Sequence, residues 1–92
     1  MTEFSYTISD PNGIHARPAG LFVQRIQGFK SIVTVIKDDH AADGTKVSTD
    51  GKKLIALMKL RIKCGQTIIV RAEGEDELVA IEAAREFLMA NL

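Results

Sequence analysis

The fold depends on the stretch Asp10-Pro11-Asn12-Gly13-Ile14-His15-Ala16-Arg17-Pro18, which separates two kinds of hydrophobic pattern. Before it, apolar residues alternate with polar ones, as in a half-buried strand, at Phe4, Tyr6 and Ile8. After it, apolar residues recur at helical spacing, at Ala19, Phe22, Val23 and Ile26. Proline suits the first turn of a helix, where its missing N–H costs nothing. The stretch therefore predicts a loop leading into a helix that begins just after His15 and ends near Gly28.

The rest of the chain continues the alternation of strands and helices. Residues 31–37 and 46–49 are predicted as strands joined by a long polar turn at residues 38–44, and residues 67–72 as a further strand. A short helix is expected at residues 52–61. Acidic residues then open a last helix, whose expected buried residues are Leu78, Ile81, Ala84 and Leu88. The order is βαββαβα, which predicts an α+β open-faced sandwich with a four-stranded antiparallel sheet and three helices on one face.

Length and composition restrict the class of protein. With 92 residues, of which 46% are hydrophobic and 26% charged, we expect residues 1–92 to form a single globular domain. Such a domain has little room for a deep substrate cavity, which argues against a stand-alone enzyme. One cysteine, Cys64, fits a reducing compartment. No signal peptide or apolar run of membrane-spanning length is evident, so the expected location is the cytoplasm, without membrane insertion.

Charge is distributed unevenly although the formal net charge is zero. Residues 51–72 contain lysines and arginines but no acid, whereas acids predominate from Glu73 onward. This pattern fits either two solvated faces or a basic docking surface for an acidic protein partner. Nucleic acid is a weaker candidate, because the basic segment contains no aromatic residue and the chain has no tryptophan.

The position of His15 suggests phosphate chemistry. A helix N-terminus presents free N–H groups and partial positive charge, which attract anions and disfavour an imidazolium ion. Arg17 adds a guanidinium group that can hold phosphoryl oxygens. The alternative is a capping or surface histidine beside a solvated arginine. A metal site is not expected, since the only other histidine, His40, lies in the long turn and is interpreted as a solvated loop residue.

The expected helix at residues 52–61 is almost without a polar side. Leu57 and Leu60, with Leu54, can contribute to the core, whereas Ile55 and Met58 then point elsewhere. An exposed apolar pair surrounded by lysines and arginines is typical of a docking patch, and methionine adapts to several partners. The alternative is a fully buried helix.

Residues 12–19, Asn12-Gly13-Ile14-His15-Ala16-Arg17-Pro18-Ala19, resemble the active-site motif of the HPr family of bacterial phosphocarriers. The resemblance extends over essentially the whole chain. It includes Gln27-Gly28-Phe29, Leu54-Ile55-Ala56-Leu57-Met58 and Ala72-Glu73-Gly74-Glu75-Asp76-Glu77. Several matches in the expected order make the resemblance specific to this family.

The resemblance implies a mechanism and a set of partners. His15 would accept a phosphoryl group on Nδ1 from phosphorylated Enzyme I and donate it to a IIA domain of a sugar transporter. Arg17 and the backbone N–H groups of Ala16 and Arg17 would hold the phosphoryl group. The docking residues would be Leu54, Ile55, Met58, Gly20 and Leu21. A monomer without cofactor or metal is expected.

The chain departs from the family at several positions. Lys53 stands where many HPr proteins carry a regulatory serine, so control by the HPr serine kinase is not expected, and Ser48, on the expected third strand, does not take over that role. Arg61 replaces the usual glycine at the end of the helix, where a left-handed conformation would cost about 1 kcal/mol. The turn at residues 38–44 is longer than usual. Gly20 costs up to about 1 kcal/mol inside a helix and could allow close packing.

Three alternative functions remain open on sequence grounds. The nitrogen-regulatory branch of the same family shares the chemistry but has other partners. A non-transferring regulator would dock through the second helix, although it would need neither His15 nor Arg17. A small RNA-binding domain is disfavoured by the lack of aromatic residues and by the neutral net charge.

Overall fold

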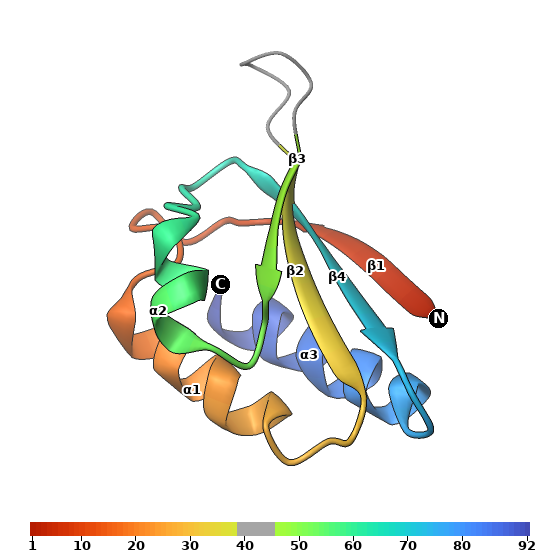
Figure 1. Ribbon diagram of the computed structural model, residues 1–92. Coiled ribbons are helices and arrows are strands. Elements are labelled where there is room, and N and C mark those ends of the chain that lie inside the picture. The colour runs from red at the N-terminus through yellow and green to blue at the C-terminus, as the bar shows by residue number, and fades with distance from the viewer. Residues whose placement is uncertain (39–45) are drawn as a thin grey trace.

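The computed structural model describes residues 1–38 and 46–92 and contains four strands and three helices in the predicted order (Figure 1). The elements are β1 (Thr2–Thr7), α1 (Ala16–Ile26), β2 (Ile32–Asp38), β3 (Lys46–Asp50), α2 (Leu54–Lys59), β4 (Thr67–Glu73) and α3 (Glu77–Asn91). The βαββαβα order predicted from the sequence is thereby confirmed. Most of the predicted turn at residues 38–44, including His40, lies outside the described residues.

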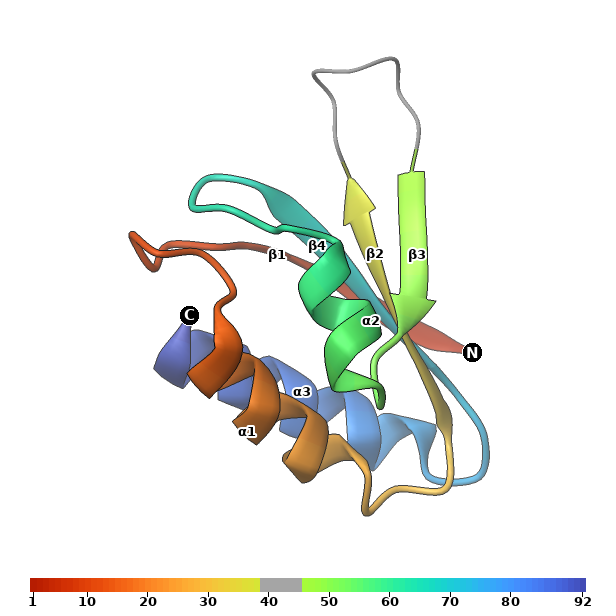
Figure 2. The same ribbon diagram turned by 60° about the vertical axis from the view of Figure 1, so that its left-hand side comes forward.

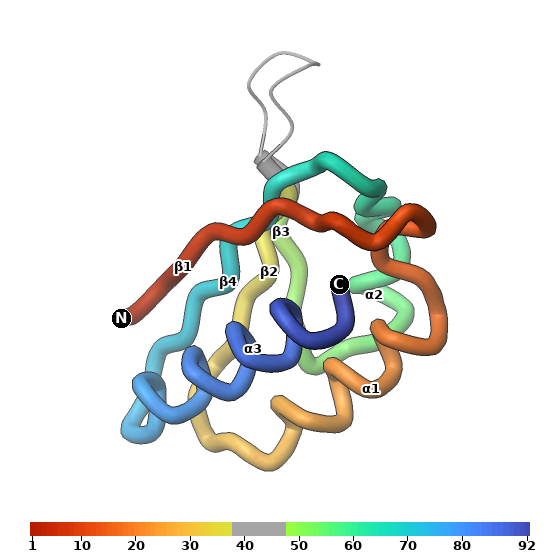
Figure 3. The backbone as a smooth tube through the Cα atoms, turned by 180° about the vertical axis from the view of Figure 1, so that it is seen from behind, coloured from red at the N-terminus to blue at the C-terminus, as the bar shows by residue number. Residues whose placement is uncertain are grey.

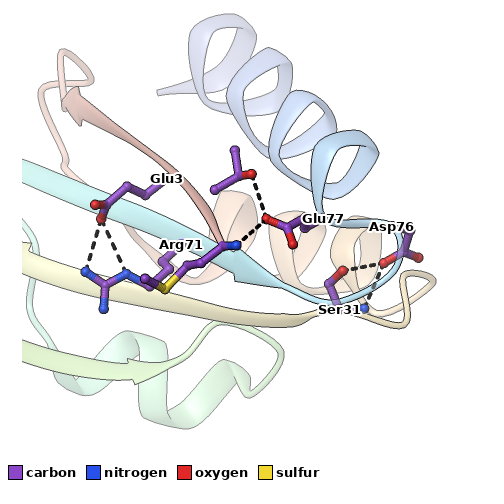
Figure 4. Close-up of polar contacts among 7 residues, drawn as sticks. Glu3, Ser31, Arg71, Asp76 and Glu77 are labelled. Carbon is purple, nitrogen blue, oxygen red and sulfur yellow. Dashed lines mark hydrogen bonds and ion pairs between the residues drawn. The ribbon is translucent and has the colours of Figure 1, made fainter.

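The strands form one sheet in the order β1-β4-β2-β3, with every neighbouring pair antiparallel. The helices lie on one face of this sheet, with α3 running across it beside α1 (Figures 2 and 3). Glu3 of β1 and Arg71 of β4 are opposite each other in the register and form an ion pair of 3.1 Å (Figure 4). The α+β open-faced sandwich predicted above is therefore confirmed.

The core lies between the sheet and the helices. In β4, alternate residues Ile68, Val70 and Ala72 are buried. The predicted apolar face of α1 is confirmed, because Ala19, Phe22, Val23 and Ile26 are all buried. Among the residues described, none of the helices is long and apolar enough to cross a membrane.

The prediction for the apolar face of α3 is wrong at one residue. Ile81, Ala84 and Leu88 are buried as expected, but the side chain of Leu78 is 71% exposed. The buried stripe also includes Ala80, and at about 100° per residue Leu78 lies roughly a third of a turn from the centre of that stripe. The small alanines let α3 approach the sheet on a side of the helix that Leu78 does not face.

The second helix is shorter than predicted, and it is not fully buried. Leu57 and Leu60 are buried, and Ile55 is 73% exposed, which excludes the alternative of a buried helix. The assignment of Leu54 to the core is wrong, because its side chain is 39% exposed. Leu54 is the first residue of α2 and lies beside α1, at the edge of the core rather than within it.

The carboxylate of Asp76 joins the turn that precedes α3 to the turn that precedes β2. Asp76, the N-cap residue of α3, accepts hydrogen bonds from the backbone N–H of Ser31 (2.9 Å) and from the buried Ser31 hydroxyl (Figure 4). It also accepts the backbone N–H of Lys30 at 2.8 Å. The Ser31 hydroxyl, followed by the Lys30 N–H, lowers the pKa of Asp76 below its ordinary value of 3.8. Gly74 (φ 153°) passes too close to Ser31 for a side chain.

This contact predicts a pH-dependent contribution to stability. Because the folded state lowers the pKa of Asp76, the stabilisation is fully present above its ordinary pKa and is lost as the pH falls through the lowered value. Asp76→Asn should therefore be less stable than the wild type at pH 7, with the difference shrinking below about pH 4. Urea denaturation at a series of pH values measures this difference. Glu75→Gln removes a neighbouring exposed carboxylate as a control, and a difference for Asp76→Asn that stays constant with pH would contradict the assignment.

Candidate functional site

His15 is the N-cap residue of α1. Its backbone is extended (φ −116°, ψ 176°), its carbonyl oxygen accepts the N–H of Ala19 at 3.0 Å, and its side chain makes no capping hydrogen bond. The residue is half-buried. The imidazole is therefore held at the mouth of the helix without being used to cap it, and it remains accessible to a partner. The interpretation of His15 as a capping residue is wrong for its side chain, since only the backbone takes part in the cap.

Two backbone donors of the first turn of α1 have no acceptor within the helix. An α-helix leaves its first N–H groups unpaired, and here the first hydrogen bond of this kind is donated by Ala19. Pro18 has no N–H, so the donors that remain are those of Ala16 and Arg17. Both residues are exposed. The helix mouth thus offers two N–H groups and partial positive charge to an anion beside His15.

The surface around His15 forms a shallow depression. Its lining residues come from the loop before α1, from α1 itself and from the last turn of α3: Asp10, His15, Arg17, Pro18, Leu21 and Asn91. The structure therefore brings the predicted pair His15 and Arg17 to the same hollow. Asp10 and Asn91 were not predicted, and Asn91 had no local signal because it is 76 positions away from His15 in the sequence.

The loop before His15 is anchored to the segment that follows α2. The N–H of Ile14 donates to the carbonyl oxygen of Ile62 at 2.9 Å. Gly13 (φ +66°) lies against the same segment, where an added Cβ would overlap the Ile62 carbonyl oxygen and come within 2.7 Å of the Cα of Lys63. On the other side, the N–H of Gly13 donates to the carbonyl oxygen of Asp10 at 2.9 Å. Only glycine fits this conformation and this spacing.

The anchor at Ile62 was not predicted from the sequence. The sequence signal for such an anchor is Gly13, because glycine is favoured where two backbone segments approach closely. The sequence does not say which segment makes that approach.

The predicted docking residues lie on adjoining parts of α1 and α2. A groove between the two helices is lined by Gly20 and Leu21 together with Arg17 and Leu54. Exposed apolar side chains continue across α2 at Ile55 and Met58, which are 73% and 37% exposed. We call the surface formed by Gly20, Leu21, Leu54, Ile55 and Met58 the α1–α2 patch. Arg17 lines both this groove and the depression at His15, so the two surfaces are continuous.

Gly20 has no neighbour among the described residues that requires a glycine. A Cβ at this position would meet nothing within 4 Å, so the close packing suggested by the sequence is not found inside the protein. The residue instead leaves a hollow in the groove between α1 and α2.

The α1–α2 patch lies on two helices without acidic residues, although Glu86 of α3 and Asp10 each share a hollow with Leu21 at its edge. No aspartate or glutamate occurs at residues 11–37 or 51–72, which include all of α1 and α2. Exposed cations are present on both helices and beside them, at Arg17, Arg25, Lys53, Lys59 and Arg61. The acids are carried elsewhere, notably on α3, which begins at Glu77 and continues with Glu82 and Glu86.

Lys53 is the N-cap residue of α2, and its side chain caps no N–H group. It is exposed, as is Ser48 on β3. A cation at a helix N-terminus is unfavourable for the helix dipole, so Lys53 is not explained by the stability of α2. Within residues 1–38 and 46–92, no three His, Cys, Asp or Glu side chains lie close enough to hold a metal ion.

Comparisons with known proteins agree on one family. The family model of the PTS HPr component phosphorylation site matches residues 2–90. The phosphocarrier protein HPr of Borreliella burgdorferi is 36% identical over 88 residues, covering 96% of this chain and 94% of that protein. The HPr-like protein Crh of Halalkalibacterium halodurans is 39% identical over 88 residues, covering 96% of each chain. The solved histidine-containing phosphocarrier protein of a mycoplasma superposes with a TM-score of 0.86 at 29% identity, covering 97% of this chain and 93% of that one.

The close approach at Gly13 predicts the effect of a single methyl group. Gly13→Ala should destabilise the protein by about 2 kcal/mol, because alanine is strained at positive φ and its Cβ overlaps the Ile62 segment. Thermal denaturation measures this loss, and NMR should show shifted amide signals at Ala16 and Arg17. Gly20→Ala is the matched control and should stabilise α1 by about 0.5–1 kcal/mol. A Gly13→Ala protein as stable as the wild type would show that the anchor is not rigid.

Proposed function

The chain belongs to the HPr family of the bacterial phosphotransferase system, and from this membership we propose that it carries a phosphoryl group on Nδ1 of His15. HPr proteins are phosphocarriers rather than stand-alone enzymes. The proposed donor is phosphorylated Enzyme I, and the proposed acceptor is a IIA domain of a sugar transporter. We place the protein in the cytoplasm, as a single-domain monomer that needs no cofactor or metal.

The observation that carries the proposal is the position of His15 beside two free N–H groups at the mouth of α1. In the transfer, the lone pair of Nδ1 attacks phosphorus while the bond between phosphorus and the donor breaks in line. The donor group leaves with the electron pair of the broken bond. The proton of the neutral ring stays on Nε2. The N–H groups of Ala16 and Arg17 and the guanidinium of Arg17 can then hold the phosphoryl oxygens.

The exposure of the site fits a carrier that must also release its phosphoryl group. Because His15 is half-buried and Arg17 is exposed, the phosphoryl group would remain partly in water. Charge-assisted hydrogen bonds are weaker in such surroundings than in a closed cavity. A carrier must both accept the phosphoryl group and give it up. Weak binding of that group is therefore an advantage, because tight binding would oppose donation.

The α1–α2 patch supports docking of partner proteins next to His15. It combines exposed apolar side chains with a rim of cations and is continuous with the depression at His15. A partner with a complementary acidic rim would be steered to this face and would cover His15 when bound. The hollow at Gly20 leaves room for a side chain of that partner.

One other function is favoured by a particular observation, and a second stays open. Similarity to the HPr-like protein Crh, at 39% identity, raises a regulatory role in which the chain docks without transferring a phosphoryl group. The nitrogen-regulatory branch would use the same site with a different Enzyme I. Lys53 at the usual regulatory serine position supports the expectation that the HPr serine kinase does not act there.

Phosphoryl transfer tests the proposal directly. The protein is mixed with Enzyme I, magnesium and labelled phosphoenolpyruvate and compared with His15→Ala. The wild type should acquire an acid-labile, base-stable label, and His15→Ala should acquire none. His40→Ala removes the other histidine as a matched control and should keep the label. Absence of label on the wild type with both the sugar-system and the nitrogen-branch Enzyme I would contradict the carrier function and favour the docking regulator.

A second experiment tests the α1–α2 patch. Ile55→Asp places a carboxylate on the patch, and it should lower kcat/KM for transfer from Enzyme I about tenfold or more, since it removes apolar contact and introduces the wrong charge. Thermal stability should change little, because the side chain is 73% exposed. Leu78→Asp on α3 is the matched control, since Leu78 is 71% exposed but lies outside the patch. Equal transfer rates for both variants would place the docking surface elsewhere.

A further inference from the structure

Arg61 has a backbone conformation that arginine adopts only at a cost. Its φ is +51°, and among the described residues it is the one non-glycine residue with positive φ. A side chain with a Cβ is strained in this region, whereas glycine is not. The side chain is exposed, so burial does not repay the strain. A strained residue with no structural benefit suggests that the side chain serves a function.

The strained residue lies between the docking helix and the anchor of the active-site loop. Its N–H donates to the carbonyl oxygen of Met58, at the end of α2, at 3.1 Å. The next residue, Ile62, is buried and accepts the N–H of Ile14 from the loop that carries His15. Arg61 therefore stands at the margin of the α1–α2 patch, on a short rigid segment held from both sides.

The surroundings of Arg61 leave its charge available. The segment 51–72 contains no acid, and neither does the segment 11–37, which contains the His15 loop and α1. Within residues 1–38 and 46–92, the guanidinium of Arg61 makes no ion pair. By contrast, Arg71 and Arg85 are paired with Glu3 and Glu82 at 3.1 and 3.5 Å. The charge of Arg61 is therefore not neutralised by a carboxylate of the described residues.

We propose that Arg61 is a specificity-determining residue, whose guanidinium pairs with a carboxylate on the acidic rim of a protein that docks on the α1–α2 patch. This inference rests on the proposed phosphocarrier function and names a contact which that function does not require. Arginine suits the role because its planar group binds a carboxylate through two hydrogen bonds. Its backbone strain is the cost of placing a cation at this point, where glycine would leave the rim without a charge.

The test compares variants that separate charge from strain. Arg61→Gly removes both, Arg61→Gln removes the charge and keeps the strain, and Arg61→Lys keeps both. Transfer from Enzyme I and transfer to a IIA domain are each measured over a range of concentrations of the carrier. The control is Arg85→Gln, which removes one exposed cation from α3, outside the patch.

The proposal predicts a separation of KM from kcat. Arg61→Gly and Arg61→Gln should raise KM about threefold in at least one of the two transfers at low salt, with kcat unchanged, as expected for one exposed ion pair. The increase should disappear near 1 M salt, where charges are screened within about 3 Å. Arg61→Lys should keep KM close to the wild-type value, and Arg85→Gln should change neither KM nor kcat.

Thermal denaturation supplies an independent readout. Arg61→Gly should raise Tm by roughly 3 °C, because relief of strain exceeds the entropy that glycine adds to the unfolded chain. Arg61→Gln should leave Tm unchanged. A variant that is more stable but docks less well would confirm that strain is retained for binding.

Three results would overturn the proposal. Wild-type KM for both Arg61→Gly and Arg61→Gln would show that no partner uses the charge. A fall in kcat without a change in KM would show instead that Arg61 acts on the His15 loop through Ile62. If neither the sugar-system nor the nitrogen-branch Enzyme I labels the wild-type protein, the proposed phosphocarrier function is wrong. The inference about Arg61 is then wrong as well.

Discussion

The hydrogen bond from the N–H of Ile14 to the carbonyl oxygen of Ile62 is the contact on which the arrangement of the site depends. It joins the loop that carries His15 to the segment that leaves α2, and the close approach of Gly13 to the same segment fixes the spacing. Because Ile62 belongs to the core and Ile14 packs against it, this contact fixes the position of the imidazole and the mouth of α1 relative to the exposed side of α2. A domain of 92 residues has little room for a closed cavity around a catalytic group. It can instead present a rigid surface whose missing half is supplied by a partner.

The distribution of charge gives that surface a direction. The formal net charge is zero, yet α1 and α2 contain no acid while α3 carries several. Cations and helix dipole therefore lie together on the face that contains His15, where they would attract the phosphoryl group and the acidic partner rim that we propose. The strain at Arg61 belongs to the same pattern, because it maintains one more cation on this face at a cost in stability. In the role that we propose for Arg61, stability and docking make opposite demands on the residue.

The element order and the helix mouth at His15 could be predicted because their signals are local. Alternation of apolar residues, the Asp-Pro-Asn-Gly loop and the helical spacing after Pro18 act within a few residues of chain. The errors at Leu54 and Leu78 arose where burial depends on how a helix is rotated against its neighbours, which periodicity alone does not determine. Local sequence patterns also could not identify Ile62 as the anchor of the His15 loop, because the two residues in contact are 48 positions apart. The resemblance to the HPr family indicated a left-handed position at Arg61, whereas the local preference of arginine gives no sign of the positive φ.

We infer that the free N–H groups of Ala16 and Arg17 hold the phosphoryl group at the mouth of α1. The most direct measurement is a ¹H–¹⁵N NMR spectrum of the uniformly labelled protein before and after phosphorylation by Enzyme I and phosphoenolpyruvate. The account predicts that the amide protons of Ala16 and Arg17 move downfield more than any others, as expected for new hydrogen bonds to an anion, while signals of α3 far from the site stay in place. Phosphorylation that leaves these two amides unshifted would contradict it, because the phosphoryl group would then be held by something other than the helix mouth.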